Sequence, residues 1–272
     1  MEVNISGRSK VGVFDSGVGG LSVWRELIKE LPFNDFVYLS DSAYCPYGPR
    51  TQEEITGRVC KAVDFLISQS VSIIVVACNT ATAAAIETLR DRYDLPFVGM
   101  EPAVKPAAIH SRTGVIGVLA TKATLNGKLY NNTLESYASG TKVVEKVGDG
   151  LVEAVERGET DSGKTENLLR KYIQPMLDAG ADHIVLGCTH YPFLVKLIEK
   201  IAGNDVTVVD PAPSVARHTY NIMVEKGLVE KGENIALGET FFYSTGEMKN
   251  FKRIVRSINR NIKENTFKRI II

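Results

Sequence analysis

The sequence predicts an α/β protein of two similar, pseudo-symmetric lobes, each with a mainly parallel sheet, and a functional site at the lobe interface. Three observations support this fold class: short apolar runs rich in β-branched residues, segments of helical spacing between them, and a pattern of strand-end residues that occurs twice. The chain has 272 residues, 44% of them hydrophobic, so it can bury one large core or two modest ones.

The expected strands lack strict alternation of apolar and polar residues, which is typical of strands buried on both faces of a sheet. In chain order they lie at 10–14, 36–39, 73–77, 114–120, 142–147, 183–186 and 206–209. Segments with apolar residues at helical spacing lie at 21–30, 55–68, 81–93 and 168–177. Because parallel neighbours need a crossover connection, the alternation of strand and helix favours parallel sheets.

Two strands of the first half and the residues that follow them have counterparts in the second half. Aligning Gly12 with Gly117 places Ser16 opposite Thr121, and each hydroxyl is followed later in the chain by a strand that ends at a cysteine. The segments are VGVFDSGVGG at 11–20 and VVACNTATAAA at 75–85, then IGVLATKATL at 116–125 and IVLGCTHYPFL at 184–194. Two matches in the same order, both with cysteine at the same place, indicate two similar α/β lobes.

The lobes are expected to be joined at two proline-containing stretches, residues 98–107 and 208–216. If the chain returns to the first lobe at the second stretch, two lobes result. The first comprises residues 1–100 together with 212–272, and the second comprises residues 101–211.

Two of the four cysteines are candidates for chemistry. Ligands of open α/β sheets bind beyond the carboxyl ends of the strands, which is where Cys78 and Cys188 fall. Each is expected to precede a helix, whose N–H groups lower a thiol pKa toward neutrality and attract a carboxylate. Cys45 and Cys60 are expected to be small buried hydrophobes. Since the chain has no C-x-x-C pair, neither a metal site nor a redox dithiol is expected.

Two thiols that face one small substrate from opposite sides suit stereoinversion at an acidic C–H bond, because one acts as base while the other acts as acid. His190, two residues after Cys188, is expected to be a proton partner. Asp15, at a strand end, either caps a helix or tunes a neighbouring thiol. Three further polar residues either cap a helix start or hydrogen-bond a ligand: Asn79, Thr80 and Thr189.

Two segments resemble nucleotide-binding motifs, but neither is expected to bind a nucleotide. The glycine-rich turn at 17–20 lacks the full G-x-G-x-x-G spacing, because Ser22 occupies the third position. The segment GETDSGKT at 158–165 fits a phosphate-binding loop letter by letter. It follows a helical pattern rather than a strand, however, and its acidic residues would lie beside the phosphates, so a turn between two helices is predicted.

Two other segments carry polar or aromatic side chains. The basic residues of 249–269 have the spacing of the solvated face of an amphipathic helix. Tyr44 and Tyr47 lie in a loop at 41–50 that is rich in proline and glycine, and such a loop at a strand end can line a pocket.

The charge balance excludes several classes of partner. Lys and Arg number 32 and Asp and Glu number 32, so the chain has no general attraction for nucleic acid or anionic lipid. The first ten residues do not have the pattern of a secretory signal, and the longest apolar run, 73–78, is far shorter than the roughly 20 residues of a membrane span. A cytoplasmic protein without a membrane or nucleic-acid partner is expected.

Five motifs in family order make the chain resemble the glutamate racemases of the aspartate/glutamate racemase superfamily. They are FDSGVGG at 14–20, CPYGPR at 45–50, ACNTA at 77–81, MEPAV at 100–104 and GCTHYP at 187–192. The resemblance implies an isomerase that interconverts L- and D-glutamate, supplies D-glutamate for peptidoglycan, and needs no cofactor, pyridoxal phosphate included. It also implies a homodimer and two α/β lobes that enclose the substrate.

The resemblance also assigns roles to individual residues. Cys78 and Cys188 match the two acid/base thiols, Asp15 and His190 match residues that assist them and contact the substrate, and Glu156 matches a further acidic position. The positions that would hold the carboxylates and ammonium of the substrate are Ser16, Tyr47, Gly48, Asn79, Thr80, Thr121 and Thr189. The chain departs from the family pattern at 40–44 and at 148–156, where it lacks a common Cys-Pro pair.

Two other functions remain open at the level of sequence. Aspartate racemases share the superfamily but commonly have Glu where this chain has His190, and residue spacing does not reveal the length of the substrate pocket. A two-lobed sensor of a small anion would use the same helix-capping groups without needing paired thiols.

Overall fold

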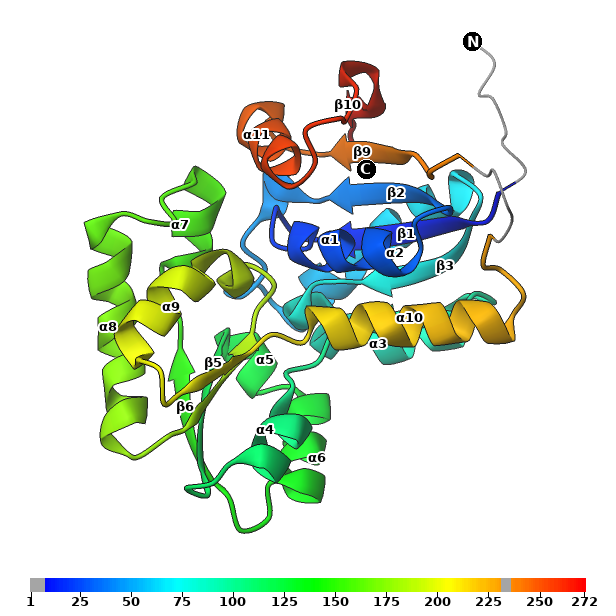
Figure 1. Ribbon diagram of the computed structural model, residues 1–272. Helices are drawn as coiled ribbons and strands as arrows, with labels where there is room; N and C mark the ends of the chain where they lie inside the picture. The colour runs from blue at the N-terminus through cyan, green and yellow to red at the C-terminus, as the bar shows by residue number, and fades with distance from the viewer. Residues whose placement is uncertain (1–7, 231–235) are drawn as a thin grey trace.

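The computed structural model describes residues 8–230 and 236–272, and it contains two parallel β-sheets flanked by helices (Figure 1). This arrangement confirms the predicted α/β class. Every strand pairing among the described residues is parallel. The parallel arrangement agrees with the near-continuous apolar character of the central strands, since helices cover both faces of such sheets.

The larger sheet has six strands in the order β10-β9-β2-β1-β3-β4. Their bounds are β1 Lys10–Asp15, β2 Asp35–Ser40, β3 Val71–Val76, β4 Phe97–Gly99, β9 Thr240–Ser244 and β10 Phe267–Arg269. The smaller sheet has four strands in the order β6-β5-β7-β8. Their bounds are β5 Val115–Ala120, β6 Lys142–Val147, β7 His183–Gly187 and β8 Thr207–Val209.

The two sheets repeat one strand order, which supports the internal duplication. In the larger sheet, the first four strands of the chain lie in the order β2-β1-β3-β4. The four strands of the smaller sheet, counted from β5, lie in the same order of second, first, third and fourth, which gives β6-β5-β7-β8. Gly12 of β1 pairs with Ile74 of β3, and Gly117 of β5 pairs with Ile184 of β7. The glycines aligned from sequence therefore occupy equivalent positions in the two sheets.

Helices cover the faces of both sheets. Their bounds are α1 Leu21–Glu30, α2 Gln52–Ser68, α3 Asn79–Arg92, α4 Val104–His110, α5 Lys122–Leu125, α6 Lys128–Tyr137, α7 Leu151–Arg157, α8 Gly163–Asp178, α9 Val195–Ala202, α10 Ala212–Glu225 and α11 Met248–Ile258. All four helices expected from periodicity are present: α1 has the predicted bounds, and α2, α3 and α8 have shifted ends. Helix α10 runs back from the smaller sheet to pack beside α1 (Figure 1).

Strands β4, β9 and β10 are not among the predicted strands. The prediction of a single amphipathic helix in the C-terminal segment is wrong. Instead of one helix over 249–269, α11 ends at Ile258 and the chain becomes extended at Asn259. The last strand begins at Phe267, whose ring stacks on Phe242 of β9 with centroids 5.1 Å apart. Aromatic burial against β9 therefore outweighs the helical charge pattern at this end of the chain.

The segment at 158–165 is a turn between two helices, as predicted. Helix α7 ends at Gly158, which adopts a left-handed conformation, and α8 begins after Ser162. The Ser162 side chain accepts a hydrogen bond from the Thr165 amide and caps α8. A helix rather than a strand precedes the turn, so the phosphate-loop interpretation fails on structural context.

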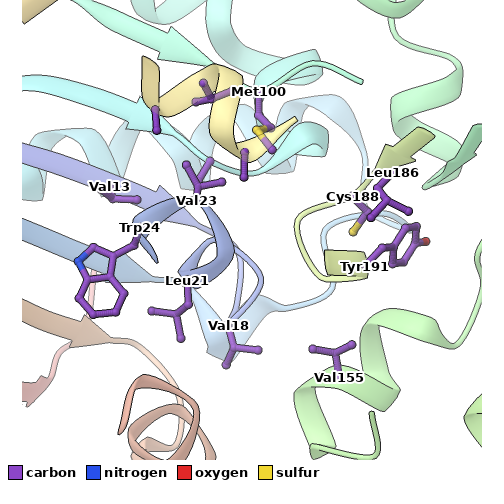
Figure 2. Packing of buried hydrophobic residues seen from close by; sticks show 14 of the residues in the cluster. Val13, Val18, Leu21, Val23, Trp24, Met100, Val155, Leu186, Cys188 and Tyr191 are labelled. Atoms are coloured by element: carbon purple, nitrogen blue, oxygen red, sulfur yellow. The ribbon is translucent and has the colours of Figure 1, made fainter. Parts of the chain in front are cut away.

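The strands divide between the sheets at the proposed lobe boundaries. Strands at 10–99 and 240–269 form the larger sheet, and strands at 115–209 form the smaller one. We therefore propose a first lobe of residues 1–100 and 212–272 and a second lobe of residues 101–211. One hydrophobic cluster nevertheless includes residues of both, among them Val13 and Trp24 of the first lobe and Leu186 and Tyr191 of the second (Figure 2).

Among the described residues, no helix has the length and apolar character needed to cross a membrane.

A buried ion pair anchors the loop that follows β2. The Asp41 carboxylate accepts hydrogen bonds from Arg58 Nη2 at 2.6 Å and Nε at 2.9 Å. It also accepts from the Tyr47 hydroxyl at 2.6 Å and from Thr245 Oγ1 at 2.8 Å. Asp41 is fully buried, and each oxygen has charged and neutral donors, so this carboxylate fixes Tyr47 relative to the sheet.

Replacing Asp41 with Ala should lower the free energy of unfolding by about 3–5 kcal/mol, because the buried Arg58 charge loses its partner. Urea unfolding monitored by circular dichroism measures the change. The matched control is Glu159→Ala, which removes an exposed partner of Arg157 and should change stability little. Equal effects of the two substitutions would contradict the role given to Asp41.

Candidate active site

A cavity of about 590 Å³ contains nearly all of the predicted site residues. Its walls come from the carboxyl ends of strands in both sheets, as well as from the loop after β2. The predicted residues in the wall are Ser16, Tyr47, Gly48, Cys78, Asn79, Thr80, Thr121, Cys188, Thr189 and His190. Asp15 is outside this wall and lies fully buried directly before Ser16.

Strand order explains why these residues converge. Ser16 follows β1 and Cys78 comes two residues after β3, and these neighbouring strands are where the strand order reverses direction. Thr121 follows β5 and Cys188 follows β7, at the equivalent point of the smaller sheet. Such switch points open a crevice at the carboxyl ends of parallel strands. Each sheet therefore contributes one hydroxyl and one thiol to the cavity.

The Cys78 thiol lies at the start of α3. Its Sγ accepts a hydrogen bond from the Ala81 amide at 3.4 Å and lies 3.6 Å from Ser16 Oγ. Burial, and after it the negative charge of Asp15, raises the pKa of the thiol to about 12. The expected shift toward neutrality is therefore wrong for Cys78, because desolvation outweighs the helix N–H groups.

Cys188 has a different local environment from Cys78. The helix expected after Cys188 begins with a short 3₁₀ turn, Tyr191–Leu194, which continues into α9. Cys188 Sγ lies 3.8 Å from His190 Nδ1. A histidine two residues on replaces the helix N-terminus as the polar partner of this thiol.

His190 joins Cys188 to Glu156 of α7. Its Nε2 lies 2.7 Å from Glu156 Oε1, which also accepts a hydrogen bond from the Val18 amide at 2.7 Å. Burial disfavours the charged form of His190, but hydrogen bonds, first of all with Cys188, outweigh burial and raise its pKa well above the usual 6.5. Burial would raise the pKa of Glu156, but the hydrogen bond and charge of His190 lower it. The pair is therefore ionic at neutral pH.

Asp15 contacts the second lobe through Thr189. The Thr189 hydroxyl donates to Asp15 Oδ2 at 3.0 Å, and the Gly17 amide donates to Oδ1 at 2.8 Å. Burial raises the pKa of Asp15, while the charge of His190 opposes the shift. Of the two alternatives drawn from the sequence, helix capping is wrong, because α1 has no side-chain cap. Tuning of a neighbouring thiol is supported, because the charge of Asp15 helps to raise the pKa of Cys78.

Three predicted binding residues in the wall have polar groups that lack a partner in the described part of the chain or pair with one another. Within the described residues, both polar atoms of the buried Asn79 amide lack a hydrogen-bond partner. Thr80 Oγ1 and Thr121 Oγ1 lie 2.9 Å apart and join the two lobes across the cavity. A buried amide without partners is costly unless a ligand satisfies it, so Asn79 indicates a polar ligand.

The glycine-rich turn serves close packing rather than phosphate binding. A Cβ on Gly17 would lie 2.0 Å from Glu156 Oε1, and a Cβ on Gly19 would lie 2.4 Å from His190 Nδ1. Only glycine lets the turn after β1 approach these side chains. The glycines at 17 and 19 are thus explained by the space that the His190–Glu156 pair needs, and not by a dinucleotide.

Cys45 is a residue of this region that sequence reasoning treated as a structural hydrophobe. It is only half-buried, and its Sγ lies 3.5 Å from Glu156 Oε1. Burial, opposed first by a hydrogen bond with His190, raises the pKa of the Cys45 thiol to about 12. The sequence feature that could have marked Cys45 as part of the site is its place in the CPYGPR motif. Its contact with α7 depends on the tertiary fold.

Comparison with known proteins decides the family. The profile described as Asp/Glu/Hydantoin racemase matches residues 19–219. The chain belongs to this racemase family. A glutamate racemase from Roseiflexus sp. (strain RS-1) is 46% identical over 250 residues, covering 92% of each chain. One from Ralstonia pickettii (strain 12J) is 43% identical over 251 residues, covering 92% of this chain and 88% of that protein.

Solved racemase structures share the fold over nearly the whole chain. A glutamate racemase isoform from Bacillus anthracis has a TM-score of 0.86 with 32% identity, covering 97% of this chain and 98% of that one. Escherichia coli glutamate racemase, solved with L-glutamate and the activator UDP-MurNAc-ala, has a TM-score of 0.84 with 28% identity at the same coverage. The family resemblance drawn from the five motifs is confirmed, and the chain is an isomerase.

The His190–Glu156 pair should make stability depend on pH. The raised pKa of His190 gives a contribution that is complete below 6.5 and is lost as pH rises through its folded-state pKa. The lowered pKa of Glu156 gives a contribution that is complete above 4.5 and is lost in acid. The joint contribution is therefore greatest between these two values.

We expect the stability difference between wild type and His190→Gln to be largest near about pH 5.5 and to shrink toward about pH 10. Urea unfolding at both values measures it. Glu156→Gln serves as the matched variant and should show the same alkaline trend. A difference that grows with pH would contradict the ion pair.

Proposed function

We propose that this racemase interconverts L- and D-glutamate through two acid/base thiols, Cys78 and Cys188. The observation that carries the proposal is that both thiols line one cavity from the carboxyl ends of different sheets. A substrate bound between the sheets would have one thiol on each face of its α-carbon. This role explains why the two cysteines have no C-x-x-C spacing, since they act on opposite faces of the substrate and do not pair with each other.

Each turnover is an exchange of the α-proton. The thiolate on one face removes the proton from Cα, the electron pair remains on the α-carbon and its carboxylate, and the thiol on the other face delivers its proton. The configuration inverts, and the two cysteines have exchanged roles. The reverse reaction uses the same groups in the opposite order.

Substrate charge activates the thiols. Burial keeps the Cys78 thiol protonated at neutral pH, with a pKa of about 12. The α-ammonium of the amino acid enters beside the thiols, and a nearby cation favours the thiolate. His190 supplies a cation to Cys188 from within the protein, at 3.8 Å. Asp15, below the cavity wall, balances the ammonium.

The neutral polar groups hold the substrate. Asn79 offers an unsatisfied amide, and Thr80, Thr121 and Thr189 offer hydroxyls that converge from both lobes. Ser16, Tyr47 and Gly48 complete the wall near Cys78. Hydrogen bonds from hydroxyl, amide and backbone groups suit the two carboxylates of glutamate without a basic surface.

Two rival functions are less well supported. Relatives that match over 92% of the chain are named glutamate racemases, which favours glutamate over aspartate as the substrate. Comparing turnover of the two amino acids decides between them. A sensor of a small anion would have no use for paired thiols, and it would bind glutamate without exchanging its α-proton.

The biological setting follows from the activity. We infer that the enzyme acts in the cytoplasm and supplies D-glutamate for peptidoglycan, and that it functions as a homodimer without pyridoxal phosphate. Sedimentation velocity at micromolar concentration should give twice the mass of the 29.8 kDa chain. A monomer with full activity would contradict the dimer.

The two-thiol mechanism predicts different behaviour for racemisation and for isotope exchange. In deuterated water the wild type should label Cα of both glutamate enantiomers. Replacing either Cys78 or Cys188 with Ala should lower racemisation at least about 100-fold, because the acid or base is lost. Each variant should still label one enantiomer, and the two variants should label opposite ones. Nuclear magnetic resonance and chiral chromatography measure the two quantities.

Cys60→Ala is the matched control, because it removes a buried thiol of α2 that lies outside the cavity wall. It should leave both quantities unchanged. Full racemisation in either catalytic variant would refute the assignment of two bases. Absence of label with folded wild-type protein would refute the racemase activity itself.

A further inference from the structure

We propose that Cys45, Glu156 and His190 form an inhibitory site for Zn²⁺ or a similar divalent transition metal. The site shares only His190 with the wall of the substrate cavity, and its effect on activity rests on the proposed function. It is not a cofactor site, because the metal would stop the reaction.

The three side chains converge although they lie far apart in the sequence. Their potential ligand atoms all lie within 4.8 Å of one another. Glu156 Oε1 lies 3.5 Å from Cys45 Sγ and 2.7 Å from His190 Nε2. Ligand atoms around a tetrahedral zinc ion need similar separations, given bonds of about 2.0–2.3 Å. Small side-chain shifts would therefore place one ion between all three.

The donor set is chemically suited to zinc. Thiolate, imidazole and carboxylate are the three protein ligands that this borderline-soft ion accepts, and a water molecule completes the four-coordinate sphere. Binding displaces the thiol proton of Cys45 and the proton on His190 Nε2. The three ligands come from the loop after β2, from α7 and from the turn after β7, so the ion would join the two lobes.

A second cavity offers a path by which a metal ion can reach the three ligands without passing through the substrate cavity. Glu156 lines a cavity of about 560 Å³ beside α7 and α11, whereas His190 lines the substrate cavity. Cys45 lines neither the substrate cavity nor the second one, and it lies against the carboxylate between them. The cluster therefore separates the two cavities. A metal ion can reach Glu156 while glutamate occupies the substrate cavity.

The charge around the second cavity is mixed. Lys249 and Arg253 lie in its wall, and they reduce the attraction of this surface for cations. The Glu156 carboxylate and the buried Asp15 act in the opposite direction. Binding strength must therefore come from the ligands, above all from the Cys45 thiolate, rather than from a general negative field.

Coordination would inactivate the histidine. His190 Nδ1 faces Cys188 at 3.8 Å, and Nε2 faces Glu156. A metal ion on Nε2 takes the place of the proton there and leaves the remaining proton fixed on Nδ1. Release of that proton to the Cys188 thiolate would leave an imidazolate, so His190 can no longer exchange a proton with Cys188. Inhibition should lower kcat and leave the apparent KM for glutamate largely unchanged.

Cobalt tests binding independently of activity. Co²⁺ added to the full-length protein should give the thiolate charge-transfer absorption and the visible bands of a tetrahedral site, at one ion per chain. Cys45→Ser keeps a hydroxyl that can still donate to Glu156 but removes the soft ligand. It should weaken Co²⁺ binding at least about tenfold, because loss of a direct ligand exceeds the loss of an outer contact.

Zinc then tests the effect on racemisation, with free Zn²⁺ set by a metal buffer because glutamate itself binds metals. The wild type and Cys60→Ala should be inhibited at the same free Zn²⁺, and Cys45→Ser should need at least about ten times more. Unchanged inhibition or an unchanged charge-transfer band in Cys45→Ser would place the metal on the catalytic thiols and overturn the proposal. A cobalt spectrum that depends on Cys45 in a protein without racemisation would refute only the proposed function.

Discussion

The hydrogen-bonded pair of His190 and Glu156 is the interaction on which the site depends. It joins the turn after β7 to α7, and the Val18 amide extends it to the first lobe. The pair needs space, which is why the turn after β1 has glycine at 17 and 19. It also places the charged His190 beside the Cys188 thiol, although burial alone would favour a neutral imidazole. Contact between the lobes and, in the mechanism that we propose, proton exchange at Cys188 thus rest on one pair.

The two thiols have different partners despite the duplicated fold. Cys78 depends on a helix start and on Ser16, whereas Cys188 depends on an adjacent histidine. A symmetric scaffold therefore carries an asymmetric pair of acid/base groups. In the mechanism and the inhibitory site that we propose, only Cys188 is open to control through a histidine, because the partners of Cys78 are a backbone amide and Ser16.

Much of the fold could be predicted because its signals are local. The strand runs that begin at 10 and 142 and the helix at 21–30 show their periodicity within a few residues. Strands β4 and β10 have three residues each, too few to show a pattern, and β9 pairs with β2 across about 200 residues of chain. The C-terminal helix was overextended, since its charges repeat regularly while the stacking of Phe267 on Phe242 depends on the tertiary structure.

The sequence by itself indicated that Ser16 would lie near Cys78 and Thr121 near Cys188, because the carboxyl ends of neighbouring parallel strands lie at one edge of a sheet. Only the tertiary structure brought the two pairs to one cavity and decided the protonation of Cys78. Burial depth is a property of the whole fold, and it raised the pKa of Cys78 where the local helix start predicted the opposite. The tertiary structure also brought Cys45 to Glu156, 111 residues along the chain, since no local spacing encodes a contact between two lobes.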